Sequence, residues 1–138
     1  MHNNTHKNKI KDVQDDIFKY PIRHTSLRNI RYSNIPHSLS DKNKILMNLS
    51  GDLKPIYDDG QVGFTQAQLY LLTDNEAYVD ILSSNLFSFI FKICKWSGFN
   101  IDKVYRDIPY IDTKMTHSEI YNLFGITDKE IECIEHNI

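Results

Sequence analysis

The chain has 138 residues, a length that suits one domain, because single domains commonly have roughly 100 to 200 residues. Hydrophobic residues make up 41% and charged residues 25%, so a folded core is expected and wholesale disorder is excluded. The net charge of -2 neither favours nor excludes a nucleic-acid partner, and the longest apolar stretch, residues 86–91, is far shorter than the roughly 20 residues of a membrane helix.

The charges are segregated along the chain. Residues 19–54 carry seven Lys and Arg against two Asp, a net charge of +5, and residues 107–138 carry seven acidic side chains against two Lys, a net charge of -5. The first segment is therefore expected to face a polyanion such as DNA, and the second is not.

The start of the chain predicts a tail. Residues 1–11 are mostly Asn, His, Lys and Thr, so we expect them to be disordered and the domain to span residues 12–138. This start has no apolar run typical of a secretory signal, and no membrane helix is predicted. An intracellular, cytoplasmic location is therefore expected.

Alternating apolar residues predict strands over residues 30–33, 44–49, 53–57 and 62–73. The residues Asp58, Asp59 and Gly60 predict a tight hairpin turn before the last of these strands. In that strand we expect Ala67, Leu69 and Leu71 to be buried, because they share one face. Phe64, Gln66, Gln68 and Tyr70 would then lie on the presented face.

A change of apolar period predicts a central helix after Thr73. Either Thr73 or Asp74 could cap it, and Gly98 would end it. Its polar strip ends in Lys92 and Lys95.

Two capping boxes, Thr116 with Glu119 and Thr127 with Glu130, predict two short helices near the C-terminus. The chain is therefore expected to be an α+β domain, with a small antiparallel sheet packed on one central helix and two short C-terminal helices closing its end.

Patterns for catalysis are missing. The five glycines form neither a dinucleotide fingerprint nor a phosphate-binding loop, and the six histidines and two cysteines do not have the spacing of zinc ligands. Asp58 and Asp59 are adjacent on a predicted turn, which explains them without an acid-base role. We therefore predict no catalytic residue, no metal site and no cofactor.

Two stretches combine cationic and stacking side chains, the mix that phosphate and base contacts require. One contains Arg28, Arg31 and Tyr32, and the other is KWSGFN at residues 95–100. Gln66 and Gln68 add amides that match the adenine edge in the major groove, although a solvated sheet face is the favoured explanation for them. The candidate DNA-binding residues are Arg28, Arg31, Lys54, Gln66, Gln68, Lys92, Lys95 and Asn100.

Several short motifs of the sequence resemble those of a known family. The run KPIYDDGQVGFTQ at residues 54–66, then a strand, a helix and KWSGFN, resembles the C-terminal DNA-recognition region of adenine-specific DNA methyltransferases of type II restriction-modification systems. The motif IPYI at residues 108–111, followed by residues 120–135, resembles the C-terminal end of such enzymes, where a Pro-containing segment precedes two small helices. The resemblance covers residues 30–135 and implies a target-recognition module that binds double-stranded DNA.

The sequence departs from that family in its catalytic parts. It has neither the Asn-Pro-Pro-Tyr or Asn-Pro-Pro-Phe motif that holds the flipped adenine nor the Gly-rich loop for S-adenosylmethionine. The resemblance therefore implies recognition without methyl transfer by this chain alone, with a separate methyltransferase catalytic subunit as a possible partner. The alternatives are a protein-interaction module that docks through its acidic C-terminal helices, or a non-functional remnant of a longer methyltransferase gene.

Overall fold

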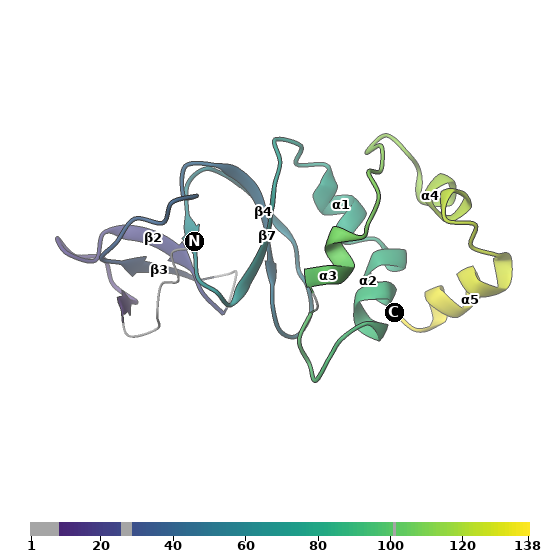
Figure 1. Ribbon diagram of the computed structural model, residues 1–138, viewed down its shortest axis with the longest axis horizontal. Coiled ribbons are helices and arrows are strands. Elements are labelled where there is room, and N and C mark those ends of the chain that lie inside the picture. Colours follow the sequence, from purple (N-terminus) through teal and green to yellow (C-terminus); the bar gives the residue numbers. More distant parts are fainter. Residues whose placement is uncertain (1–8, 26–28, 101) are drawn as a thin grey trace. The chain divides into compact units, whose positions relative to one another are not determined.

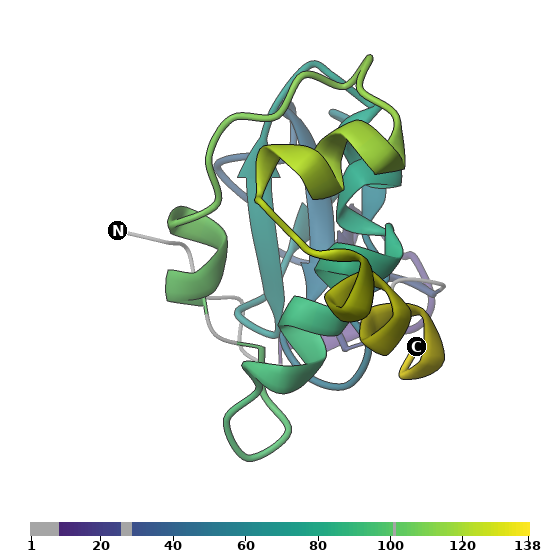
Figure 2. The same ribbon diagram turned by 90° about the vertical axis from the view of Figure 1, so that its right-hand side faces the viewer.

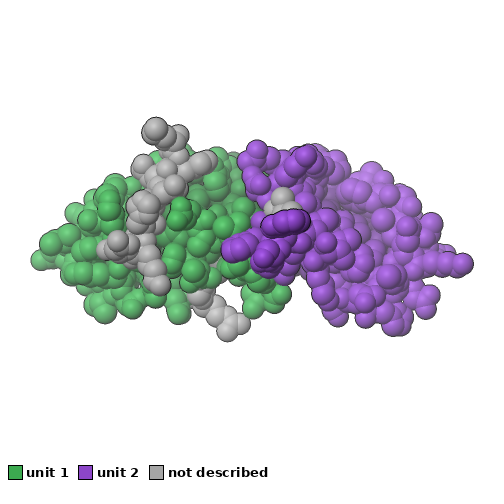
Figure 3. Space-filling model, turned by 60° about the horizontal axis from the view of Figure 1, so that its bottom comes forward, with its two compact units in different colours: residues 1–76 green, residues 77–138 purple. Residues whose placement is uncertain are grey.

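The computed structural model describes residues 9–25, 29–100 and 102–138. The chain divides into two compact units, residues 1–76 and residues 77–138, where the sequence predicted one domain (Figure 3). The described strands all belong to the first, which we call the strand unit, and the described helices to the second, the helix unit (Figure 1). The α+β class is confirmed. No helix in the described ranges is long and apolar enough to cross a membrane.

The strand unit contains two small sheets. The first has the order β1-β3-β2-β6, with β1 (Ile10–Lys11), β3 (Ile30–Ser33), β2 (Tyr20–Arg23) and β6 (Gly63–Phe64), and its β2 and β6 are parallel. The second is antiparallel and has the order β5-β4-β7, with β5 (Ile56–Asp59), β4 (Asn43–Asn48) and β7 (Gln68–Leu72).

The strand predicted over residues 30–33 is confirmed as β3, and the strand over 44–49 is confirmed as β4 with ends shifted by one residue. Strands β1 and β2 of the first sheet were not expected. Strand β1 lies inside the predicted tail, because Ile10 and Lys11 pair with β3, and residues 1–8 of that tail lie outside the described residues. Strand β2 has a proline at its second position, which hid it from a search for alternating residues.

The turn at Asp59 and Gly60 was predicted to join two paired strands of a hairpin, and this pairing is wrong. Strand β5 ends at Asp59 and pairs with β4, and β7 pairs with the other side of β4. The chain that leaves the turn forms β6 beside β2 instead. The turn itself is present: Gly60 has a φ of 85°, and a Cβ there would lie 2.8 Å from the carbonyl oxygen of Asp41. The position therefore requires glycine.

The strand predicted over residues 62–73 is interrupted after β6. The hydroxyl of Thr65 accepts a hydrogen bond from the amide of Ala67 at 3.3 Å, and the carbonyl of Thr65 accepts one from the amide of Gln68 at 3.1 Å. These local bonds turn the chain, so the segment forms two short strands in different sheets.

The buried face of this segment is also the opposite of the prediction. Phe64 is buried in a cluster with Leu46 and Val62, and the ring of Tyr70 packs 4.9 Å from the ring of Phe64. Leu71, which was predicted to be buried, is 39% exposed. The face with the aromatic rings therefore packs inward, because large rings bury more apolar area than leucines do.

A buried ion pair lies at the centre of the strand unit. Lys44 of β4 is fully buried, and its ammonium group contacts the carboxylate of Asp58 at the end of β5. The same ammonium donates hydrogen bonds to the carbonyls of Lys42 at 2.9 Å and Ser40 at 3.4 Å. The amide of Gln61 donates to the carboxylate of Asp58 at 3.3 Å. Both charges are thus compensated inside the protein, as buried charges must be.

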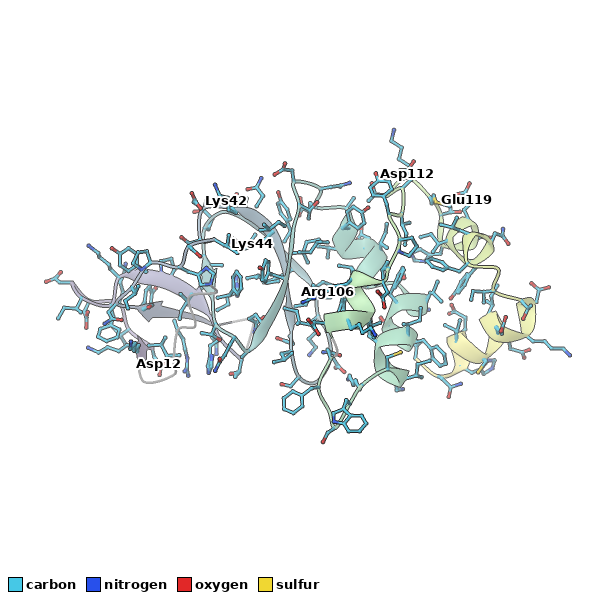
Figure 4. The ribbon with its side chains drawn as sticks, viewed as in Figure 1. Asp12, Lys42, Lys44, Arg106, Asp112 and Glu119 are labelled. Atoms are coloured by element: carbon cyan, nitrogen blue, oxygen red, sulfur yellow. The ribbon has the colours of Figure 1, made fainter. Side chains whose placement is uncertain are left out.

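We expect Lys44→Met to lower the free energy of unfolding by about 3 to 5 kcal/mol, because it leaves the Asp58 carboxylate buried without its cation. Lys42→Met is the matched control: Lys42 and Asp41 form an exposed pair at 3.6 Å (Lys42 and Lys44 are labelled in Figure 4), and its loss should change the stability by less than about 1 kcal/mol. Urea denaturation of both variants measures this difference. Equal stabilities would contradict a central role of the buried pair.

The helix unit contains α1 (Tyr78–Leu82), α2 (Asn85–Ile93), α3 (Asp102–Arg106), α4 (His117–Leu123) and α5 (Asp128–His136). The predicted central helix is two helices, because Ser84 has an extended ψ of 157° and starts α2 after α1 has ended. Both capping boxes are confirmed, with Thr116 and Thr127 at the N-caps of α4 and α5. Helix α3 was not predicted from the sequence.

The helices of this unit pack around aromatic side chains of α2. The ring of Phe87 lies 5.9 Å from Phe91 and meets the ring of Phe124 edge-on at 6.0 Å. Polar contacts join α2 to α5: the side chain of Asn85 donates to Glu135 at 2.6 Å, and the ammonium of Lys92 donates to the carbonyl of Asn137 at 2.8 Å. Helix α2 is therefore held along its length.

Candidate nucleic-acid interface

The basic segment of residues 19–54 is not a free cationic surface in the structure. Its Lys44 is buried against Asp58, Lys42 pairs with Asp41, and Arg31 pairs with Asp12 at 2.9 Å. The segment therefore presents less positive charge than its net charge of +5 suggests, because local carboxylates neutralise part of it. Lys54 remains exposed on the connection between β4 and β5, and the predicted residue Arg28 lies outside the described residues.

Arg23 of the same segment also belongs to the interior of the strand unit. Burial lowers the pKa of its guanidinium, and the negative charge of Asp58 partly opposes this shift. Its Nε atom is buried, and the described residues provide no hydrogen-bond partner for it. Arg23 is therefore half-buried, and its charge interacts with that of Asp58.

The two glutamines predicted to read bases together are separated by the turn at Thr65. Gln66 is exposed on the connection between β6 and β7. Gln68 is only 5% exposed, and its amide nitrogen donates to the carbonyl of His24. Gln68 thus ties β7 to the residue that follows β2. The predicted face of Gln66 and Gln68 does not form, because one amide is used inside the protein.

The remaining predicted residues lie in the helix unit. Lys92, at the end of α2, is exposed although its ammonium contacts Asn137, and Lys95 lies just beyond the helix and is half-buried. Asn100 is buried, which contradicts its prediction as a DNA contact. Lys92 and Lys95 are therefore the predicted cations that lie next in sequence to an exposed aromatic segment of this unit.

That segment is the Trp96 loop, residues 94–100 between α2 and α3. Trp96 and Phe99 form an antiparallel bridge in which each amide donates to the carbonyl of the other, at 3.0 and 2.9 Å. Between them, Ser97 and Gly98 have φ angles of 49° and 84°, as in the two-residue turns of β-hairpins. Figure 2 shows the loop leaving the end of α2 and turning back before α3.

The Trp96 loop exposes large apolar side chains. Trp96 is 76% exposed, Phe99 is 52% exposed and the neighbouring Ile93 is 63% exposed. Residues directly opposite each other in an antiparallel pair project to the same side, with Cβ atoms about 5 Å apart. The hairpin therefore presents Trp96 and Phe99 together, and Trp96 is not a core residue.

Charge around the loop differs from charge in the rest of the helix unit. Residues 77–138 carry six Lys and Arg against nine Asp and Glu, a net charge of -3. Residues 92–106 alone carry Lys92, Lys95, Lys103 and Arg106 against Asp102, a net charge of +3. Arg106 (labelled in Figure 4) pairs with Asp102 at 2.7 Å, and the three lysines form no ion pair with described residues. The exposed aromatic pair thus lies in the cationic part of an acidic unit.

Stacked rings hold the helices that flank the loop. The ring of Tyr105 on α3 lies 4.4 Å from the ring of Phe91 on α2, at an interplanar angle of 31°. Burial raises the pKa of Tyr105, and no described residue accepts or donates a hydrogen bond at its hydroxyl. The ring positions α3 against α2, whereas the unpaired hydroxyl lowers the stability.

Comparisons of the chain with protein-family models, curated proteins and solved structures gave no match. The functional proposal below is therefore based on the side chains of the Trp96 loop.

We expect Tyr105→Phe to raise the free energy of unfolding by about 1 kcal/mol, because it removes a buried hydroxyl that lacks a partner and keeps the stacked ring. Tyr121→Phe is the matched control. The Tyr121 hydroxyl donates to Glu135 at 2.8 Å, and burial together with this bond raises its pKa to about 12. Its loss should lower the stability by about 1 kcal/mol. Thermal and urea unfolding of both variants would show opposite signs, and equal signs would contradict the assignment.

Proposed function

We propose that this chain binds double-stranded DNA through the Trp96 loop and the lysines beside it. The observation that carries the proposal is the exposure of Trp96 and Phe99 on a hairpin within a segment of net charge +3. Lysines neutralise phosphates and release counterions, and aromatic rings contact bases. An exposed aromatic pair within a cationic segment therefore suits a polyanion that also has flat apolar surfaces.

More specifically, we propose that the chain is a target-recognition module of a restriction-modification system that works with a separate adenine methyltransferase subunit. The resemblance of residues 54–66, 95–100 and 108–135 to the recognition region of such enzymes supports this role. The Trp96 loop coincides with the second of these words, KWSGFN. The sequence lacks the adenine-holding motif, so methyl transfer would require the partner.

The alternative of a protein-interaction module on the acidic C-terminal helices has less support. Several of the carboxylates on which it depends are used within the helix unit. Glu119 and Glu130 close the capping boxes, and these hydrogen bonds lower the pKa of both groups. Glu135 accepts from Asn85 and Tyr121. Part of the acidic charge is therefore used in contacts within the helix unit. Binding of a basic protein is one of the possible results of the test below.

We expect duplex DNA to bind with an affinity that falls as salt rises. Each phosphate contact contributes about 0.9 to the slope of log affinity against log salt concentration, so Lys95→Ala should weaken binding to all sequences and reduce the slope by about 1. Lys129→Ala, an exposed lysine on α5, is the matched control and should leave both quantities unchanged. Fluorescence anisotropy with a labelled duplex at several salt concentrations measures them.

Absence of binding at low salt would overturn the proposal. An equal effect of Lys95→Ala and Lys129→Ala would show that binding depends on overall charge and not on the Trp96 loop. Binding of a basic protein that added DNA does not displace would favour the protein-interaction alternative.

A further inference from the structure

The rings of Trp96 and Phe99 have a geometry that phosphate binding alone does not require. The bridge between the two residues holds both on one side of a two-residue turn, and the two φ angles of the turn are positive. Within the described part of the chain, neither ring stacks on another aromatic ring. The bridge thus fixes the backbone that carries both rings, so less backbone entropy is lost on binding than for a loop without it.

Intact duplex DNA offers few free base faces, because each base is covered by its neighbours in the stack. An inserted side chain must first unstack a base step, which is unfavourable. At an abasic site or a one-nucleotide gap, that stacking is already lost and the next base has an open face. An exposed indole gains the full stacking interaction there.

Resting on the proposed DNA binding, we propose that Trp96 stacks on a base at an interruption of the duplex, with Phe99 beside it, so that the chain binds interrupted duplexes in preference to intact ones. The net charge of +3 over residues 92–106 complements the phosphates on both sides of such a site. Lys92 and Lys95 precede the aromatic pair along the chain, and Lys103 follows it. These three lysines thus lie within seven residues of the aromatic pair along the chain and could contact the phosphates of a strand whose base stacks on Trp96.

The sequence provides its own reporter, because Trp96 is the single tryptophan of the chain. Stacking on a base should quench its fluorescence. We expect a duplex with a central abasic site or a one-nucleotide gap to bind about tenfold more tightly than the intact duplex of the same sequence, and to quench the fluorescence more strongly at saturation. Single-stranded DNA of the same length serves as a reference for stacking without a duplex.

Variants separate stacking from general attraction. Trp96→Ala should bring the affinity ratio of interrupted to intact duplex down to about 1, and Trp96→Phe should keep part of it, because a smaller ring still stacks. Tyr110→Ala is the matched control: Tyr110 is an exposed aromatic residue elsewhere in the helix unit, and its removal should leave the ratio as in the wild type.

Salt-dependent binding with equal affinity for both duplexes and no quenching would overturn this inference but leave the proposed DNA binding intact. No binding to any DNA would overturn both. Anionic phosphatidylserine vesicles are a further arm of the experiment. A blue shift of the Trp96 emission on the vesicles, without any preference among the duplexes, would assign the loop to a lipid surface and would also overturn the inference.

Discussion

The strand unit depends on the ion pair of Lys44 and Asp58. A lysine at the second position of the central strand β4 has no route to solvent, so its charge must be compensated inside the sheet. Asp58 does this from β5, and the amide of Gln61 also binds its carboxylate, which fixes the turn after β5. That turn directs Val62 and Phe64 into the core. The pair therefore couples charge compensation to the course of the chain, as a buried polar contact does when it specifies one arrangement among several.

Features that depend on neighbouring residues could be predicted from the sequence. The capping boxes at Thr116 and Thr127 involve residues three positions apart and formed as expected. The break between α1 and α2 was not visible, because the apolar spacing continues through Ser83 and Ser84 into a second helix that buries the same kind of face. A periodic pattern reports which residues are buried, and it does not report whether the backbone hydrogen bonds run without interruption.

Pairing between distant segments could not be predicted from the sequence. This pairing determined which of the predicted site residues are buried and which are exposed. The choice of buried face after Gly60 depended on whether leucines or aromatic rings pack inward, and the ring cluster of Phe64 and Tyr70 settled it. The side chain of Gln68 is consequently buried, and its amide nitrogen donates a hydrogen bond to the carbonyl of His24. The mixture of cationic and aromatic residues near Trp96 was visible in the sequence, but its exposure was not. The backbone bridge to Phe99 places both rings on one side of an exposed hairpin, and this pairing was not visible in the sequence.

These placements give different weight to the words that resemble methyltransferase recognition regions. The run of residues 54–66 is largely explained by the fold: Asp58 compensates Lys44, Gly60 has the φ that the turn requires, and Val62 and Phe64 are core residues. Unrelated proteins with a similar turn could share such residues for structural reasons. The Trp96 loop differs, because burial explains neither Trp96 nor Phe99, and an exposed apolar pair in water needs another reason to be retained. A functional interpretation of the resemblance therefore depends mainly on this loop.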